Sequence, residues 1–319
     1  MPIAPSSQPR LVALIGGSGF IGTALTEAFA ALGWRVLAVC RNPENARHLK
    51  PLGDLGQIGA RAGDVRDEAG LRTALSGADA VVNLVGILEE KGGQRFADIH
   101  VRGAANAANA ALAAGARAFV QLSAIGASPQ SPSAYYRTKA EGEAAVRAVL
   151  PDAAIVRPSL VFGAGDSFTN RFASLIAAAP AVPVIAPETR FQPVYVNDVA
   201  AAIVAIVERQ FIGNAGKLWE LGGPEILRMR DLVAFIAEAT GQEKPLVDTP
   251  DFGARLLSSF GFLPGAPLTQ DQYLMLKADN ILSGQYPGLG DLGIPGTPLA
   301  AVAGQWLGRY RTGGRFAVA

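Results

Sequence analysis

The chain has 319 residues, of which half are hydrophobic and 17% are charged, a balance typical of a folded α/β protein and not of a disordered chain. A formal net charge of +1, without a long run of Lys and Arg, argues against nucleic acid as a partner. The single cysteine, Cys40, excludes an intrachain disulfide, and no cysteine pair stands near either of the two histidines to suggest a metal site.

The N-terminus, residues 1–9, lacks the basic and apolar segments of a signal peptide and is expected to be flexible. The longest mostly apolar run, residues 173–186, is too short to span a bilayer and contains Pro180 and Pro183. We therefore expect a cytoplasmic protein without a transmembrane segment, which would be peripheral to the inner membrane only through a partner.

From residue 10 onward, short runs rich in Val, Ile and Leu alternate with longer Ala-rich stretches, as in successive βαβ units. The first helix is predicted over residues 20–32 and ends at Gly33. Strands are predicted at residues 11–15, 35–39, 58–61, 80–85, 118–122 and 153–156. This spacing predicts an α/β fold with a doubly wound parallel Rossmann sheet.

Beyond residue 160, glycine and proline interrupt the regular alternation, which predicts a second lobe. Residues 10–160 are assigned to a dinucleotide-binding Rossmann domain, and residues 191–210 are expected to return to it. A smaller, interleaved C-terminal α/β lobe, formed by residues 161–190 and 211–319, would receive a substrate or a partner.

The first predicted βα turn carries three glycines with G-x-x-G-x-x-G spacing. Gly16 permits a tight turn, Gly19 leaves room for a pyrophosphate, and Gly22 lets the helix pack closely on the strand. The helix opens with Phe20 and Ile21, where backbone amides and the helix dipole favour phosphate. These five residues are predicted to bind a nicotinamide dinucleotide.

The end of the second predicted strand indicates which dinucleotide is bound. An acidic residue there would bind the ribose hydroxyls of NAD(H), but the strand ends in Val39-Cys40-Arg41. The Arg41 guanidinium suits a 2′-phosphate, so we predict NADP(H) rather than NAD(H). The alternative is that Arg41 is only a solvated loop residue.

The candidate catalytic residues are Tyr135, Lys139 and Ser123. Tyr135 and Lys139 are one helical turn apart, so the ammonium can lower the phenol pKa and hold a ribose while the phenol exchanges a proton. Ser123, at the end of the preceding strand, can bind a substrate oxygen or simply cap the next turn. Asp64, after the third strand, suits the adenine amino group or an ordinary turn.

These motifs, together with Asn83-Leu84-Val85-Gly86 and Arg157-Pro158, resemble the extended and atypical short-chain dehydrogenase/reductase superfamily, which is epimerase/dehydratase-like. The resemblance spans most of the first 200 residues. It implies that the dinucleotide site also includes Asp64, Val65, Leu84, Val85, Gly86, Lys139 and Pro158.

A closer resemblance extends over almost the whole chain, to the Rossmann-type accessory subunit family of respiratory complex I and its bacterial relatives. It is carried by residues 157–163, 166–170, 191–199, 219–224 and 268–272. This resemblance implies a nucleotide that is held structurally, and a respiratory NADH:quinone oxidoreductase complex as partner.

Two departures from the superfamily pattern bear on catalysis. Where the superfamily places its catalytic hydroxyl, one or two positions beyond Ser123, this chain has Ala124 and Ile125, and His100 stands in place of a common Asn. We therefore interpret the chain as an NADP(H)-binding protein that holds its nucleotide structurally. An active NADP-dependent oxidoreductase or epimerase/dehydratase using Tyr135 and Lys139, and a sensor of the NADP(H) ratio, remain as alternatives.

Overall fold

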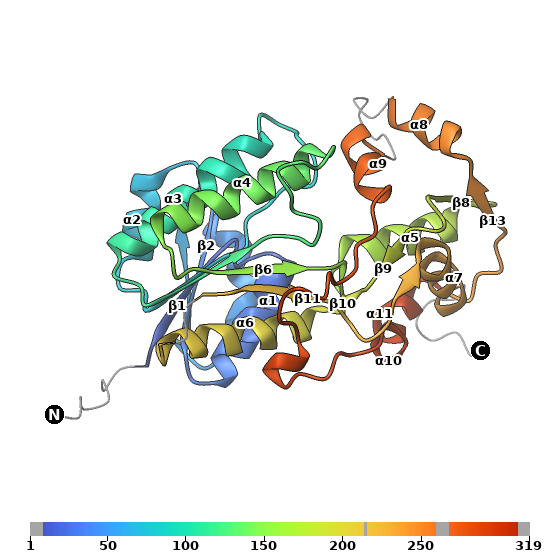
Figure 1. Cartoon of the computed structure of the whole chain (residues 1–319). Coiled ribbons are helices and arrows are strands. Elements are labelled where there is room, and N and C mark those ends of the chain that lie inside the picture. Colours follow the sequence, from blue (N-terminus) through green and yellow to red (C-terminus); the bar gives the residue numbers. More distant parts are fainter. Residues whose placement is uncertain (1–8, 214–215, 260–267, 312–319) are drawn as a thin grey trace. The chain divides into compact units, whose positions relative to one another are not determined.

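The computed structural model describes residues 9–213, 216–259 and 268–311 (Figure 1). Residues 1–8 of the predicted flexible N-terminus lie outside the described residues. The chain divides into two units that interleave along the sequence. The first comprises Met1–Ser123, Thr138–Val156 and Ala200–Trp219, and the second comprises Ala124–Arg137, Arg157–Val199 and Glu220–Ala319.

A seven-stranded sheet is the main feature of the fold. Its strands are β1 (Leu11–Ile15), β2 (Arg35–Cys40), β3 (Ile58–Ala62), β4 (Ala80–Asn83), β5 (Ala118–Leu122), β6 (Ala154–Pro158) and β11 (Leu218–Leu221). The strand order is β11-β6-β5-β4-β1-β2-β3, and the pairs from β3 to β6 are parallel. The chain reverses its winding direction between β1 and β4, which confirms the predicted doubly wound α/β fold.

Helices cover both faces of this sheet, with α2, α3 and α4 on one face and α1 and α6 on the other (Figure 1). Their bounds, with those of two irregular helices, are α1 (Phe20–Ala31), η1 (Pro43–Leu52), α2 (Glu68–Leu75), η2 (Ala97–Arg102), α3 (Gly103–Ala113), α4 (Ala134–Val149) and α6 (Val196–Phe211). Strands β1, β4 and β5 are buried along almost their whole length, because helices pack on both of their faces.

Two details of the sheet differ from the sequence prediction. Strand β4 ends at Asn83 and not at Val85, because the Asn83 Oδ1 atom accepts the Val85 amide at 3.2 Å and diverts it from the strand ladder. Strand β11 was not predicted. It is only four residues long and contains a buried glutamate, Glu220, so it lacks the apolar run that marked the other strands.

The described part of the second unit contains three two-stranded sheets and several short helices. The pairs are β7 (Val161–Phe162) with β10 (Val194–Tyr195), β9 (Arg190–Phe191) with β12 (Leu227–Arg228), and β8 (Val182–Ile185) with β13 (Leu246–Thr249). The helices are α5 (Ser167–Ala178), α7 (Met229–Ala239), α8 (Asp251–Ser259), α9 (Gln270–Leu276), η3 (Gly290–Leu292), α10 (Leu299–Val302), α11 (Gly304–Leu307) and η4 (Gly308–Tyr310).

The second unit has its own apolar core. Phe162 is 1% exposed and packs in a cluster that includes Ile176, Val233 and Trp306. Phe162 is therefore a core residue of this unit. In the part of the chain that the structure describes, no helix combines the length and the hydropathy needed to cross a membrane.

Candidate functional site

The first glycine of the loop between β1 and α1 is required by its conformation and by its neighbours. Gly16 has a φ of +81°, and its amide donates to the Val39 carbonyl at 2.8 Å. A Cβ atom at this position would lie 3.1 Å from the Val85 Cγ2 atom. Gly16 thus turns the chain sharply at the carboxyl ends of β1, β2 and β4.

Two glycines take part in the close packing of this loop. A Cβ atom on Gly22 would lie 2.3 Å from the Gly17 carbonyl oxygen, so Gly22 lets α1 approach the loop that follows β1. Gly17 is the residue that approaches the strands, because its Cβ atom would lie 2.9 Å from Leu14 and 3.1 Å from the Ala38 Cα atom. The sequence analysis did not single out Gly17, although the Gly-Gly pair was its signal.

The N-terminus of α1 is suited to bind an anion. No side chain of the described residues caps this end, and its first turn contains no acidic residue. The N-cap residue, Gly19, presents no side chain, and the amides of Phe20 and Ile21 belong to the first turn. Backbone donors and the positive end of the helix dipole therefore favour a phosphate here.

Charged side chains gather where β2 and β3 end. The Asp64 carboxylate accepts hydrogen bonds from the Arg66 Nε atom at 3.0 Å and the Arg66 Nη2 atom at 2.6 Å. The bond from Arg66 lowers the pKa of Asp64, and the positive charge of Arg41 adds to this effect. Arg41 is exposed, and its Nη1 atom lies 3.5 Å from the Gln94 Oε1 atom. The carboxylate predicted to bind adenine is therefore held by Arg66.

The segment after β4 lies beside the glycine loop. The Leu84 amide donates to the Ile15 carbonyl at 2.9 Å, while the predicted cofactor residue Val65 has its carbonyl bound by Asn106. A Cβ atom on Gly86 would lie 3.0 Å from the Lys139 Nζ atom. The first unit thus brings Leu84, Val85, Gly86 and Lys139 to the same end of the sheet as Gly16.

Lys139 is a buried cation, 6% exposed, on α4. Its Nζ atom donates to the Leu122 carbonyl at 3.3 Å. Burial lowers the pKa of Lys139 to about 8, and the negative charge of Glu143 opposes this change. A lysine in this state can hold a ribose hydroxyl or supply positive charge to a neighbouring phenol.

The hydroxyl of Ser123 is bound within the protein. Ser123 is 4% exposed, and its Oγ atom donates to the Glu143 Oε1 atom at 2.5 Å. Glu143 is itself buried and lies one turn beyond Lys139 on α4. The sequence analysis did not consider Glu143, although its four-residue spacing from Lys139 was the available signal. The proton of the Ser123 hydroxyl is donated to the Glu143 carboxylate. The catalytic role of Ser123 stays a prediction.

His100 is buried and neutral. Its Nε2 atom lies 3.1 Å from the Ile87 amide, which can only donate, so Nε2 accepts and Nδ1 carries the ring proton. Nδ1 lies 3.0 Å from the Thr138 hydroxyl. Burial lowers the pKa of His100 to about 3, and the charge of Lys139 lowers it further. His100, which stands where the superfamily commonly has Asn, is therefore a neutral side chain held in place by hydrogen bonds at both ring nitrogens.

Tyr135 lies in the first turn of α4, in the part of this helix that belongs to the second unit. Burial raises the pKa of its phenol, and the neighbouring phenol of Tyr136 raises it further. Lys139 follows four residues later on the same helix, as predicted. Pro158, the remaining predicted cofactor residue, also belongs to the second unit, where its carbonyl accepts the Ile125 amide at 3.1 Å.

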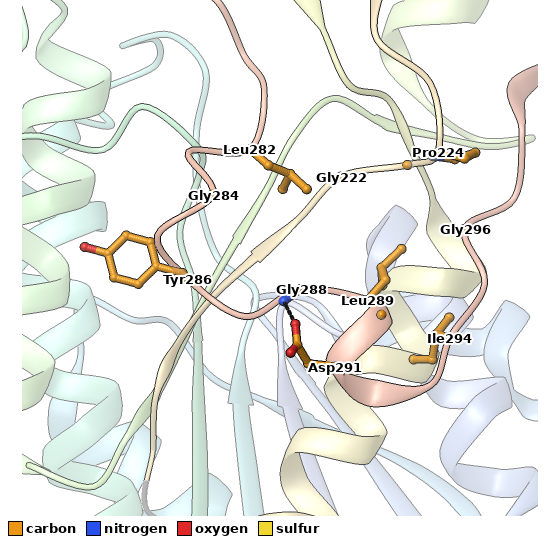
Figure 2. A pocket seen from close by; sticks show the side chains of 12 residues that line it. Gly222, Pro224, Leu282, Gly284, Tyr286, Gly288, Leu289, Asp291, Ile294 and Gly296 are labelled. Carbon is orange, nitrogen blue, oxygen red and sulfur yellow. Dashed lines mark hydrogen bonds between the residues drawn. The ribbon is translucent and has the colours of Figure 1, made fainter.

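A cavity of about 370 Å³ lies within the second unit (Figure 2). Part of its wall is fixed by Glu220, whose carboxylate accepts the amide and the hydroxyl of Ser283 at 2.7 Å each. The cavity is lined by Gly222, Gly223, Pro224, Leu282, Gly284, Tyr286, Gly288, Leu289, Gly290, Asp291, Ile294 and Gly296. None of the predicted catalytic or cofactor residues is among them. Over the described residues, no cluster of three His, Cys, Asp or Glu side chains is suited to a metal ion.

Curated relatives cover most of the chain. A protein of Arabidopsis thaliana described as NADH dehydrogenase (ubiquinone) 1 alpha subcomplex subunit 9, mitochondrial, is 32% identical over an alignment of 323 positions that covers 97% of this chain and 80% of the relative. A ceramide reductase of Caulobacter vibrioides is 34% identical over 251 residues, covering 76% of this chain and 74% of that protein.

Solved structures share the fold at lower identity. The NADPH-dependent quinone oxidoreductase of Escherichia coli, complexed with NADPH, superposes with a TM-score of 0.69 at 23% identity, covering 93% of this chain and 99% of that one. Residues 12–222 match the NAD dependent epimerase/dehydratase family, and these residues contain the glycine loop, Lys139 and all of the sheet except Leu11. The chain therefore belongs to the NAD-dependent epimerase/dehydratase family.

Proposed function

We propose that this protein holds NADP(H) as a structural nucleotide and does not turn over a substrate. The observation that carries this proposal is the 2.5 Å hydrogen bond from Ser123 to Glu143. The strand-end hydroxyl of an active reductase must be available to the substrate oxygen, whereas this one is buried and bound to a carboxylate. Ala124 and Ile125 offer no replacement.

The preference for NADP(H) is proposed from the charges at the ends of β2 and β3. The residue directly after β2 is Arg41, and not a carboxylate that would repel a 2′-phosphate. The carboxylates of Asp64 and Glu44 are paired with Arg66 and Arg47. A 2′-phosphate would therefore meet positive charge from Arg41 without an opposing free carboxylate.

The proposed partner is a respiratory NADH:quinone oxidoreductase complex. The Arabidopsis relative is described as a subunit of mitochondrial NADH dehydrogenase, and the similarity to it covers nearly the whole chain. A nucleotide that stabilises a fold without reacting would suit such an accessory role. We propose a cytoplasmic location, peripheral to the inner membrane through this partner.

An NADP-dependent carbonyl reductase is the second candidate, because Tyr135 and Lys139 are retained and a relative is described as a ceramide reductase. A bound nicotinamide would supply the hydride. Tyr135 would donate its phenolic proton to the carbonyl oxygen, and the Lys139 ammonium would stabilise the tyrosinate left behind. The raised pKa of Tyr135 opposes this step, since it makes the tyrosinate costly to form.

Replacing Tyr135 with Phe separates the two functions. Under the structural proposal, Tyr135→Phe keeps its bound nucleotide, and its free energy of unfolding changes by less than about 1 kcal/mol, since one hydroxyl contributes little net stability. Nucleotide content, urea unfolding and carbonyl-dependent NADPH oxidation would be measured. The neighbouring variant Tyr136→Phe is the control. NADPH oxidation by the wild type that only Tyr135→Phe abolishes would make the protein a reductase.

A further inference from the structure

The N-terminus of α4, which carries Tyr135, is capped by a residue from far along the chain. The first backbone amides of a helix have no partner within the helix. Here the Ala134 amide donates to the Asp271 Oδ1 atom at 2.6 Å, and the Tyr135 amide donates to the Asp271 Oδ2 atom at 3.1 Å. The Tyr136 amide lies 3.4 Å from the Ser133 hydroxyl. One carboxylate thus binds two of the first three amides of this helix.

Asp271 is held in place by its own surroundings. The Ser133 hydroxyl donates to its Oδ2 atom at 2.9 Å, and the Ser133 side chain is fully buried. Asp271 lies in the first turn of α9, where Thr269 and Gln272 form a reciprocal capping box. Helix α9 and Ser133 therefore hold the Asp271 carboxylate through contacts other than those with the amides of α4.

The chain that follows α9 binds the same region a second time. The Asn280 side chain donates to the Ile125 carbonyl at 3.2 Å and accepts the Ser159 hydroxyl at 2.8 Å. The Asn280 side chain also lowers the pKa of the Tyr136 phenol, against the larger effect of burial, which raises it. All of these residues lie in the second unit, so residues 269–280 bind both the start of α4 and the segments beside it.

We propose that Asp271 is a positioning residue for Tyr135. The carboxylate binds the Tyr135 amide itself, and the turn that it closes leads directly to Lys139 on the same helix. Without it, the first turn of α4 loses the acceptor of two amides and frays, which loosens Tyr135 and the helix that carries Lys139, the predicted ligand of the ribose. The proposal rests on the proposed function, because it assumes that α4 contacts the bound dinucleotide.

The test compares two Asp-to-Asn variants of the full-length protein. Asp271→Asn weakens the cap on α4. Asp166→Asn is the matched control, because Asp166 also binds two backbone amides, of Gly163 and Thr169, and one hydroxyl, at the start of α5. Hydrogen exchange would be measured on the peptide 131–138, and NADPH release would be followed by its fluorescence.

We expect Asp271→Asn to speed exchange of the amides of Ala134 and Tyr135 by about fivefold or more, the size of a lost helix cap, and to speed NADPH release as well. Asp166→Asn should change neither. Unchanged exchange in Asp271→Asn overturns the proposal, as does faster exchange with wild-type NADPH release, which would make Asp271 a helix cap only.

Failure of the proposed function gives a different result. If the wild-type protein binds no NADPH, the proposed function fails, while hydrogen exchange alone decides whether Asp271 fixes the turn that carries Tyr135. If Asp271→Asn does not fold, Ser133→Ala takes its place, because it removes the hydroxyl that holds the Asp271 carboxylate. The same two rates then support or overturn the proposal.

Discussion

At the carboxyl end of the sheet, several polar side chains are already hydrogen-bonded to other groups of the protein. Arg66 binds Asp64, Glu143 binds the Ser123 hydroxyl, and His100 is fixed between an amide and a hydroxyl. These residues do not need a ligand to satisfy their hydrogen bonds. Arg41, in contrast, is exposed, and among the described residues its guanidinium lies at the edge of hydrogen-bonding distance from Gln94.

This contrast leads to a prediction for Arg41. Arg41→Ala should weaken NADPH binding by about tenfold or more, the size of a lost charge-assisted hydrogen bond, and leave NADH binding nearly unchanged. Titrations of the apo protein with each nucleotide would measure this difference. Arg72→Ala, which removes an exposed guanidinium paired with Glu68, is the control. Equal losses for both nucleotides would exclude a contact with the 2′-phosphate.

A second prediction concerns His100 and pH. Burial lowers its pKa to about 3 in the folded protein, from an ordinary value of 6.5, so only the unfolded chain takes up a proton as the pH falls from 6.5 towards 3. The stabilising contribution is thus complete above pH 6.5 and is lost on acidification, by about 2 kcal/mol at pH 5. His100→Gln should lose less stability than the wild type between pH 7 and pH 5.

Urea unfolding at the two pH values measures this difference. His48→Gln is the matched control, because His48 is the other histidine of the chain and is exposed. It should keep the wild-type dependence. If His100→Gln shows the same loss of stability as the wild type, His100 is not held neutral by burial.

Among the elements, helices α1 and α4 begin in opposite ways. Helix α1 starts with Gly19, and no described side chain caps it, so its amides are suited to bind a phosphate. Helix α4 starts beneath the Asp271 carboxylate, which already binds two of its amides. We therefore expect an anion to bind at the start of α1, and we propose that the Asp271 carboxylate holds the turn of α4 that carries Tyr135.

Alanine substitutions in the glycine loop test the role of α1. A Cβ atom on Gly19 meets only the Gly16 carbonyl oxygen, at 3.3 Å, whereas one on Gly22 would lie 2.3 Å from the Gly17 carbonyl oxygen. Gly19→Ala should therefore change stability by less than about 1 kcal/mol and still weaken nucleotide binding, while Gly22→Ala costs about 2 kcal/mol or more. Thermal unfolding of the apo proteins and NADPH titrations would show this. Equal destabilisation by both substitutions would contradict the geometry.

The elements also show what local sequence patterns can predict. Hydrophobic periodicity and turn residues predicted six strands of the sheet, helix α1 and the glycine loop, because each of these signals lies within one element. The end of β4 was misplaced because a side chain, Asn83, takes an amide that the backbone would otherwise use. Strand β11 was not predicted because it contains the acidic residue Glu220. This carboxylate is buried because it binds Ser283, which lies far along the chain.

At the scale of the whole molecule, the motifs correctly predicted the family, but the contacts between distant segments were not predictable. Tyr135 and Lys139 were found from their spacing, whereas nothing local indicated that Asp271 would bind the amides before them. Similarly, Ser123 was recognised as a strand-end hydroxyl, but its bond to Glu143 depends on how α4 packs on β5. Such contacts between distant segments decide whether Tyr135, Lys139 and Ser123 can work together as the catalytic residues of a reductase.

We propose that NADP(H) is a permanent structural part of this protein. To test this, the purified protein would be denatured, the released nucleotide identified by mass and absorbance, and its exchange with labelled NADPH followed before denaturation. We expect about one NADP(H) for each chain, which exchanges slowly and whose removal lowers the unfolding temperature. NAD(H), no nucleotide, or NADP(H) that exchanges within seconds would show that the nucleotide is not a structural NADP(H).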